Sequence, residues 1–205
     1  MPVRPGAGND FNIHIASGHP RPQRRLANVE AMKTVTLFRH AKSDWKDSPS
    51  IDDFDRPLAD RGLKAAPKMG RAMRENGITP DLILCSSSVR TRQTLALAEP
   101  EAWDTLPDIR FEDALYHAKS SAMTSMLQEL PETVAHVMIV GHNPGLQKLA
   151  MQLTKAGDDA ETRLADGFPT AAVATLSFDI EAWGELSGKS GSVELFLTPK
   201  SLKSA

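Results

Sequence analysis

Three short apolar runs, each followed by small residues and a basic side chain, constrain the fold of this chain most strongly. They cover residues 34–38, 81–85 and 135–140. Short runs of this kind, bounded by small and polar residues, are typical of buried strands. If these strands are parallel neighbours, their C-terminal ends meet at one edge of the sheet, where ligands of open α/β sheets bind. At that edge we expect four basic side chains: Arg39, His40, Arg90 and His142.

Helical and extended patterns alternate along the rest of the chain. Asp60 is expected to cap a first helix, and Pro67, which falls inside it, should bend the helix or shift its start. Alternation of this kind predicts an α/β three-layer sandwich, with helices on both faces of a mostly parallel sheet that carries an antiparallel edge. The expected helices are 60–76, 89–98, 121–130 and one from about Pro144 to 153, and two late strands are expected at 172–178 and 193–197.

An arginine beside a histidine at a strand end suits chemistry on a phosphoryl group. The guanidinium of Arg39 can clamp phosphoryl oxygens while the His40 imidazole attacks phosphorus. A second arginine and a second histidine around that imidazole would complete a pocket for a dianion. His40 must be neutral at the attacking nitrogen, and a hydrogen bond between its other nitrogen and a backbone carbonyl would fix the tautomer.

Seven stretches between about residues 34 and 200 make the chain resemble a known family. The chain is similar to the histidine phosphatase superfamily and, within it, to the small phosphohistidine phosphatases of the SixA type. The resemblance implies a phosphoglycerate-mutase-like fold. The matching stretches are LFRHAKSDW (37–45), DFDRPLADRG (53–62), DLILCSSSVRTRQT (81–94), LYHA (115–118), VGHNPG (140–145), and FPTAAVATLSFD with the later TPK.

The same resemblance implies the role of each basic side chain. His40 matches the nucleophile that is transiently phosphorylated, and Arg39 and Arg90 match the phosphate-binding arginines. His142 matches the second histidine, which contacts the phosphoryl group and stabilises the transition state. The implied enzyme is a hydrolase that needs no cofactor and no metal, because the arginines supply the positive charge.

The general acid for the leaving group is left open. Glu112 and Asp113 are the candidates, because many relatives take a carboxylate from this part of the chain. An imidazole bound to phosphorus is protonated easily and departs without a dedicated acid, whereas an alkyl ester needs one. Lys42 and Asn143 are candidate accessory residues. The remaining histidines are expected to play no catalytic part: His14, His19, His117 and His136.

Other functions remain open at this stage. The run from Cys85 to Arg90 is similar to the phosphate loop of cysteine-dependent phosphatases, but it has four intervening residues where those loops have five. No long insertion is available to form a lid, so we favour a phosphohistidine on a protein as the substrate. A small-molecule phosphomonoesterase is the alternative, and a module that binds phosphorylated partners without hydrolysing them is a third.

Composition indicates the setting of the protein. A net charge of −2 and 5% aromatic residues favour neither a nucleic-acid surface nor a membrane patch. The single cysteine fits a reducing, cytoplasmic location. Residues 1–33, rich in proline, glycine and arginine, are expected to be a disordered tail before a phosphatase domain at 34–205. Translation from Met32 instead of Met1 is a hypothesis, and the oligomeric state is left open.

Overall fold

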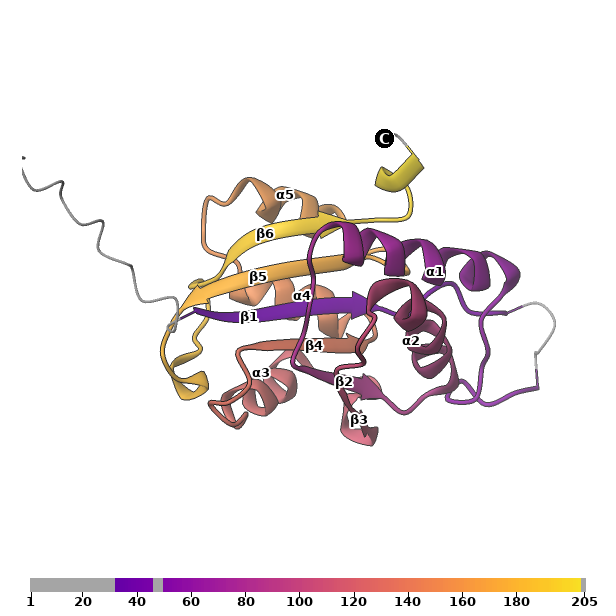
Figure 1. The fold of residues 1–205 in the computed structure, drawn as a ribbon, viewed down its shortest axis with the longest axis horizontal. Helices are drawn as coiled ribbons and strands as arrows, with labels where there is room; N and C mark the ends of the chain where they lie inside the picture. Colours follow the sequence, from indigo (N-terminus) through magenta and orange to yellow (C-terminus); the bar gives the residue numbers. More distant parts are fainter. Residues whose placement is uncertain (1–31, 46–49, 204–205) are drawn as a thin grey trace, which may run out of the picture.

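One six-stranded sheet runs through the centre of the molecule, in the order β3-β2-β4-β1-β5-β6 (Figure 1). The computed structural model describes residues 32–45 and 50–203, so residues 1–31 of the predicted tail lie outside the described part of the chain. The first strand starts at Met32, two residues before the predicted run. The strands are β1 (Met32–Arg39), β2 (Leu82–Ser86), β3 (Asp108–Glu112), β4 (His136–Gly141), β5 (Val173–Asp179) and β6 (Ser192–Leu197).

Four neighbouring strands are parallel and the other two form an antiparallel side. Strand β2 pairs in parallel with β3 and β4, and β4 pairs in parallel with β1. Strand β5 is antiparallel to β1, and β6 is antiparallel to β5. The prediction that the three apolar runs are parallel neighbours is therefore confirmed, because β2, β4 and β1 lie side by side.

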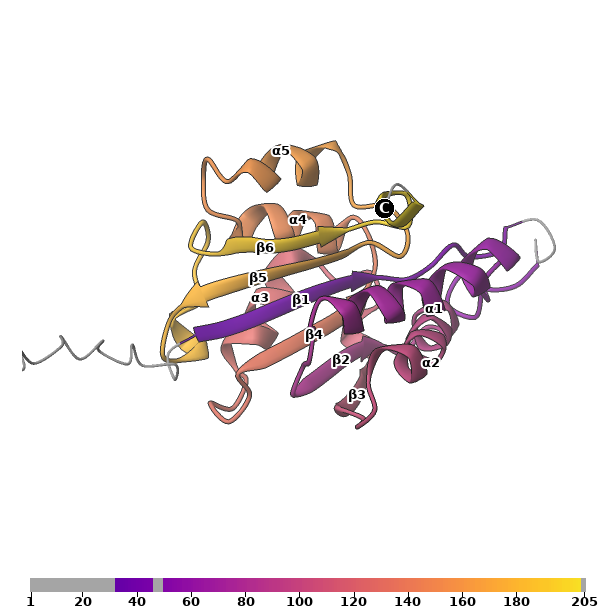
Figure 2. The same cartoon turned by 45° about the horizontal axis from the view of Figure 1, so that its top comes forward.

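Helices cover both faces of the sheet, which confirms the predicted three-layer sandwich (Figure 2). The first two helices pack on one face and the last three on the other. No helix within residues 32–45 and 50–203 is both long and apolar enough to cross a bilayer. The helices are α1 (Asp60–Glu75), α2 (Val89–Ala102), α3 (Ser120–Gln128), α4 (Gly145–Leu153) and α5 (Asp159–Asp166).

Alternate residues of the central strands supply the two halves of the core. In β1, Val35 and Leu37 pack into the cluster beneath α3, α4 and α5, whereas Phe38 packs into the cluster beneath α1 and α2. All three side chains are fully buried. A strand that is buried on both faces reads as a nearly continuous apolar run, which is why the sequence indicated β1, β2 and β4 so clearly.

Several local predictions need correction. The N-cap of α1 is Ala59, and Asp60 is the first helical residue instead of the cap. Pro67 lies inside α1 and does not shift its start. Strand β3 and helix α5 were not predicted at all. Most side chains of β3 are exposed, and α5 is eight residues long and mostly polar, so neither carries the apolar pattern on which sequence prediction depends.

A close contact between α1 and α2 leads to a test of this packing. A Cβ atom at Gly70 would lie 2.2 Å from the carbonyl oxygen of Ala98. Ala is favoured over Gly inside a helix by about 1 kcal/mol, so helix propensity alone predicts that Gly70→Ala stabilises the protein. We expect the opposite, a loss of about 1–3 kcal/mol in the free energy of unfolding measured in urea, because the helices must separate.

Gly184→Ala is the matched control, because no atom lies within 4 Å of its added Cβ. Its free energy of unfolding should stay within about 0.5 kcal/mol of the starting value. A Gly70→Ala protein that is as stable as the control would show that the two helices do not pack this closely.

Candidate active site

A cavity of about 480 Å³ opens beside the C-terminal ends of β1 and β4. All four basic side chains predicted to converge line it, although they come from three separate segments of the chain. The described residues that line the cavity are Arg39, His40, Lys42, Ser43, Trp45, Asp53, Arg56, Arg90, His117, His142, Asn143 and Thr170.

His40 is held rigidly just beyond the end of β1. Its backbone N–H donates to the carbonyl oxygen of Gly141 (3.1 Å), and its carbonyl oxygen accepts from the N–H of Ala171 (3.0 Å). The ring Nδ1 lies 2.7 Å from the carbonyl oxygen of Ala41, so Nδ1 must carry the proton and donate it. Burial lowers the pKa of His40 to about 4, and the charges of Arg90 and Arg39 act in the same direction. His40 is therefore neutral near pH 7, with an unprotonated Nε2 that can act as a nucleophile.

His142 lies next to His40, with 5.2 Å between the ring centroids. Its Nε2 is 2.9 Å from the hydroxyl oxygen of Ser86, the last residue of β2. Burial lowers the pKa of His142 to about 3, and repulsion from His40 and Arg90 adds to this effect. Its Nδ1 is buried and has no hydrogen-bond partner among the described residues.

Arg90 is buried and Arg39 is half-buried, and hydrogen bonds hold the guanidinium of each. Arg39 donates from Nη1 to the carbonyl oxygen of Phe168 (2.7 Å), and burial lowers the pKa of its guanidinium. Arg90, in the first turn of α2, donates from Nη2 to Oδ2 of Asp53 (2.9 Å) and from Nη1 to the Asp53 carbonyl oxygen. Both guanidiniums are thereby oriented before any anion binds, which favours clamping of phosphoryl oxygens.

Asp53 is a site residue that the sequence analysis did not assign. Besides Arg90, its carboxylate accepts a hydrogen bond from the Tyr116 hydroxyl (2.8 Å) and lies 3.5 Å from Nε of Arg56. Burial alone would raise the pKa of Asp53, but the hydrogen bond from Tyr116 and the charge of Arg90 outweigh it and lower the pKa to about 2. Asp53 begins the stretch 53–62 that contributes to the family resemblance, but no strand or helix pattern in the sequence indicates that its carboxylate reaches the cavity.

His117, for which the sequence predicts no catalytic part, is one of the residues that line the cavity. Its ring stacks on His142, with 5.6 Å between centroids, and its Nε2 is 3.4 Å from Oδ2 of Asp53. The backbone of His117 has a φ of 53°, in the left-handed region that residues other than glycine rarely adopt. Strained conformations of this kind cluster at functional sites.

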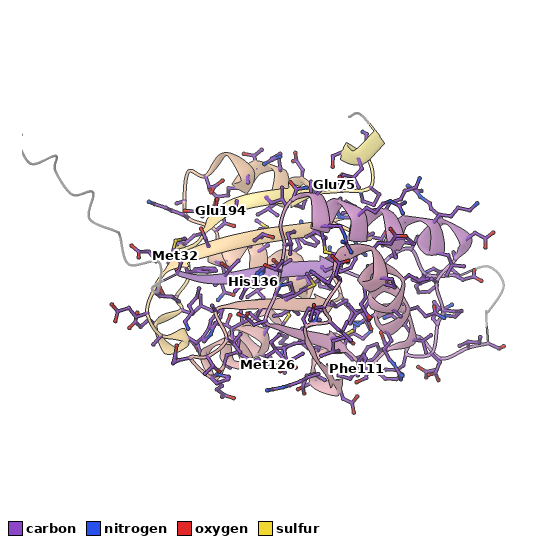
Figure 3. All side chains as sticks on the ribbon, viewed as in Figure 1. Met32, Glu75, Phe111, Met126, His136 and Glu194 are labelled. Atoms are coloured by element: carbon purple, nitrogen blue, oxygen red, sulfur yellow. The ribbon has the colours of Figure 1, made fainter. Side chains whose placement is uncertain are left out.

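Glu112 and Asp113, the candidate general acids, are not among the residues that line the cavity. Glu112 ends β3, where it pairs with Ser86, and Asp113 begins the exposed turn η2 (Asp113–Leu115). Because β3 is the outermost strand of the sheet, β2 and β4 separate it from β1. His136 also lies away from the site, at the opposite end of β4 (Figure 3). His14 and His19 lie outside the described residues.

Both candidate accessory residues line the cavity. Lys42 is exposed at its rim. Asn143 donates from Nδ2 to the carbonyl oxygen of Phe168 (3.0 Å), the same atom that holds Arg39. Trp45, also at the rim, lies under the guanidinium of Arg56, 4.0 Å from its ring centroid. Within residues 32–45 and 50–203, no group of three or more His, Cys, Asp or Glu side chains has an arrangement suited to a metal ion.

The structure does not support the cysteine alternative. Cys85 is fully buried in the core beneath α1 and α2 and is not part of the cavity lining. Burial raises the pKa of its thiol to about 12. Near neutral pH the side chain is therefore a thiol, whereas a cysteine nucleophile must be a thiolate.

Comparisons with known proteins show the family of the chain. The model of the histidine phosphatase superfamily (branch 1) matches residues 35–117. A protein from Agrobacterium tumefaciens proposed to be the phosphohistidine phosphatase SixA has a solved structure with 33% identity and a TM-score of 0.67, and the alignment covers 82% of this chain and 98% of that one. The chain belongs to the histidine phosphatase superfamily.

Two further proteins resemble the chain. A protein from Nakamurella multipartitia, also proposed to be SixA, has a structure with 26% identity and a TM-score of 0.71, covering 82% of this chain and 96% of that one. An uncharacterised protein of Mycobacterium tuberculosis is 36% identical over 142 residues, which are 68% of this chain and 85% of the relative. The resemblance to SixA-type histidine phosphatases and the phosphoglycerate-mutase-like fold are thus confirmed.

The protonation of the two central histidines can be measured directly. Because burial lowers both pKa values, each imidazole should remain neutral as the pH falls through 6.5 and should gain its proton only near pH 4 for His40 and near pH 3 for His142. NMR titration of the ring nuclei would follow both transitions, with His40→Asn and His142→Asn identifying the signals. A midpoint near 6.5 for His40 would mean that the nucleophile is not desolvated as described.

Proposed function

We propose that this protein is a metal-independent phosphatase that removes the phosphoryl group from phosphohistidine on another protein, through a phosphorylated His40. The observation that carries the proposal is the state of Asp53. It is the one carboxylate among the described residues that line the cavity, and a pKa near 2 keeps it ionised. An ionised carboxylate has no proton to give to a leaving group.

The absence of a protonated carboxyl group among the described residues of this lining suits a phosphoramidate better than an ester. When phosphorus leaves a protonated imidazole, the ring departs as a neutral molecule and needs no further proton. An alkoxide leaving group is far more basic and needs a proton in the transition state. The names of the SixA relatives, which refer to phosphohistidine, support the same choice of substrate.

In the first step, the Nε2 lone pair of His40 attacks phosphorus in line with the bond to the substrate imidazole. The new N–P bond forms as the old one breaks, and its electron pair returns to the departing ring. Negative charge spreads over three equatorial oxygens, where Arg39, Arg90 and Nδ1–H of His142 can donate to it. The carbonyl oxygen of Ala41 stabilises the positive charge that develops on the His40 ring.

In the second step, water attacks the phosphorus of phosphorylated His40 from the side that the substrate has vacated. The P–Nε2 bond breaks, its electron pair returns to the imidazole, and the proton of the water leaves with phosphate or passes to solvent. His40 is restored to its neutral form. We assign to Asp53 the task of holding Arg90 in place through both steps.

In this proposal the positive charge at phosphorus comes from Arg39 and Arg90, so treatment with EDTA leaves turnover unchanged. A cytoplasmic location is part of the same proposal. It is supported by the free thiol of Cys85, the single cysteine of the chain, which suits a reducing compartment.

A comparison of substrates tests the proposed function. We expect kcat/KM for a phosphorylated histidine-containing phosphotransfer domain to exceed that for sugar and nucleotide phosphates by on the order of 100-fold, because esters lack the ~10²–10⁴-fold help of a general acid. His40→Asn should reduce turnover by roughly 10⁴-fold or more.

The alternatives give different results in the same assay. Turnover confined to the small phosphates would identify a phosphomonoesterase and overturn the proposed substrate. Binding of phosphorylated proteins with no turnover of any substrate would identify a binding module.

A further inference from the structure

Two open cavities continue the active-site cavity across the surface and form what we name the cationic groove. The first, of about 900 Å³, shares Arg39 and Asn143 with the active-site cavity. The second, of about 560 Å³, shares Arg61 and Lys200 with the first. The groove therefore leads without interruption from the phosphate-binding arginine to the exposed side of α1.

The groove is strongly positive although the chain as a whole carries a net charge of −2. Two carboxylates, Asp60 and Asp166, line it. Against them stand six cations, from β1, α1, α5 and the segment after β6: Arg39, Arg61, Lys64, Lys68, Arg163 and Lys200.

Most of these cations have no carboxylate partner in the part of the chain that the structure describes. Among the described residues, no ion pair involves any of the five exposed ones, Arg61, Lys64, Lys68, Arg163 and Lys200. Elsewhere on the surface, cations do find partners, as in the pairs of Arg71 with Glu101 and Lys189 with Glu161.

Unpaired like charges repel one another and are costly to gather in one place. A bound anion would relieve this repulsion, so the charge pattern indicates a negatively charged ligand.

The floor of the groove is partly apolar. Phe168 and Phe196 line it, with 5.6 Å between their ring centroids, and the Arg163 guanidinium lies 5.9 Å from the Phe196 centroid. Leu202 lines the outer part. A surface that combines aromatic and arginine side chains is suited to contact with a protein.

We infer that the cationic groove docks an acidic surface of the phosphorylated partner protein while its phosphohistidine enters the active-site cavity. The inference rests on the proposed function and adds the surface by which the partner is recognised. A protein ligand is favoured because the groove extends well past the phosphoryl site and combines charge with an apolar floor. Charge complementarity of this kind raises the rate of association and selects the partner.

The test reverses charge at the far end of the groove, away from the phosphoryl site. The double variant Arg61→Glu, Lys64→Glu changes two exposed residues of α1. The control double variant Arg110→Glu, Lys155→Glu makes the same change in net charge at exposed residues that line neither the groove nor the active-site cavity. Far-UV circular dichroism and urea unfolding would verify that both variants are folded.

Each variant is assayed on an acidic histidine-containing phosphotransfer domain in its phosphorylated form and on a small aryl phosphate. We expect the α1 variant to lose roughly tenfold or more in kcat/KM on the phosphoprotein at low salt, chiefly through KM, with the loss shrinking as salt rises. Its kcat/KM on the aryl phosphate should stay within about twofold of the unaltered enzyme, since that substrate does not reach α1.

Three results would overturn the inference. The α1 variant could lose no more on the phosphoprotein than the control does. It could lose activity equally on the aryl phosphate, which would assign these residues to phosphate binding. The unaltered protein could bind a fluorescent oligonucleotide that the α1 variant does not bind, which would assign the groove to nucleic acid. Failure of the proposed function is distinguishable, because the unaltered enzyme would then hydrolyse the aryl phosphate but not the phosphoprotein.

Discussion

The hydrogen bond from Nδ1 of His40 to the carbonyl oxygen of Ala41 is the contact on which the chemistry of this site depends. It places the one proton of a neutral imidazole on the nitrogen that faces the backbone, and it leaves Nε2 with a free lone pair. Burial beside two arginines keeps the ring neutral near pH 7. A surface histidine could adopt either tautomer and would be partly protonated. The fold thus restricts one side chain to a single protonation state, as the proposed nucleophilic role of His40 requires.

The surrounding charges are arranged by tertiary contacts from several segments. Asp53 lies between Arg90, Tyr116 and His117, so one carboxylate orients an arginine and joins two loops at the cavity. The cost of burying Asp53 is offset by these partners, which is why its pKa falls. A carboxylate held ionised in this way has no proton to donate to a leaving group. This constraint supports the proposed phosphoramidate substrate.

The sequence predicted the strands that carry a local apolar pattern. It did not predict the site residues whose positions depend on irregular segments or on the order of the strands in the sheet. Strands β1, β2 and β4 are continuous apolar runs, so their ends, and with them Arg39, His40 and His142, could be placed at one edge of the sheet. Asp53 and His117 lie in irregular segments, which carry no periodic signal. Glu112 lies at the C-terminal end of a strand, much as His40 does, but β3 is an edge strand that β2 and β4 separate from β1. Proximity to a strand end indicates a site only when the position of that strand is known.

The position of phosphate on the trapped phosphoenzyme tests the central claim most directly. Rapid denaturation of the protein during turnover of an aryl phosphate, followed by ³¹P–¹⁵N correlation NMR, would identify the modified atom. We predict phosphate on Nε2 of His40, because Nδ1 of the same ring donates a hydrogen bond to the carbonyl oxygen of Ala41. Phosphate on Nδ1 of His40, or on another residue, would contradict this description of the site.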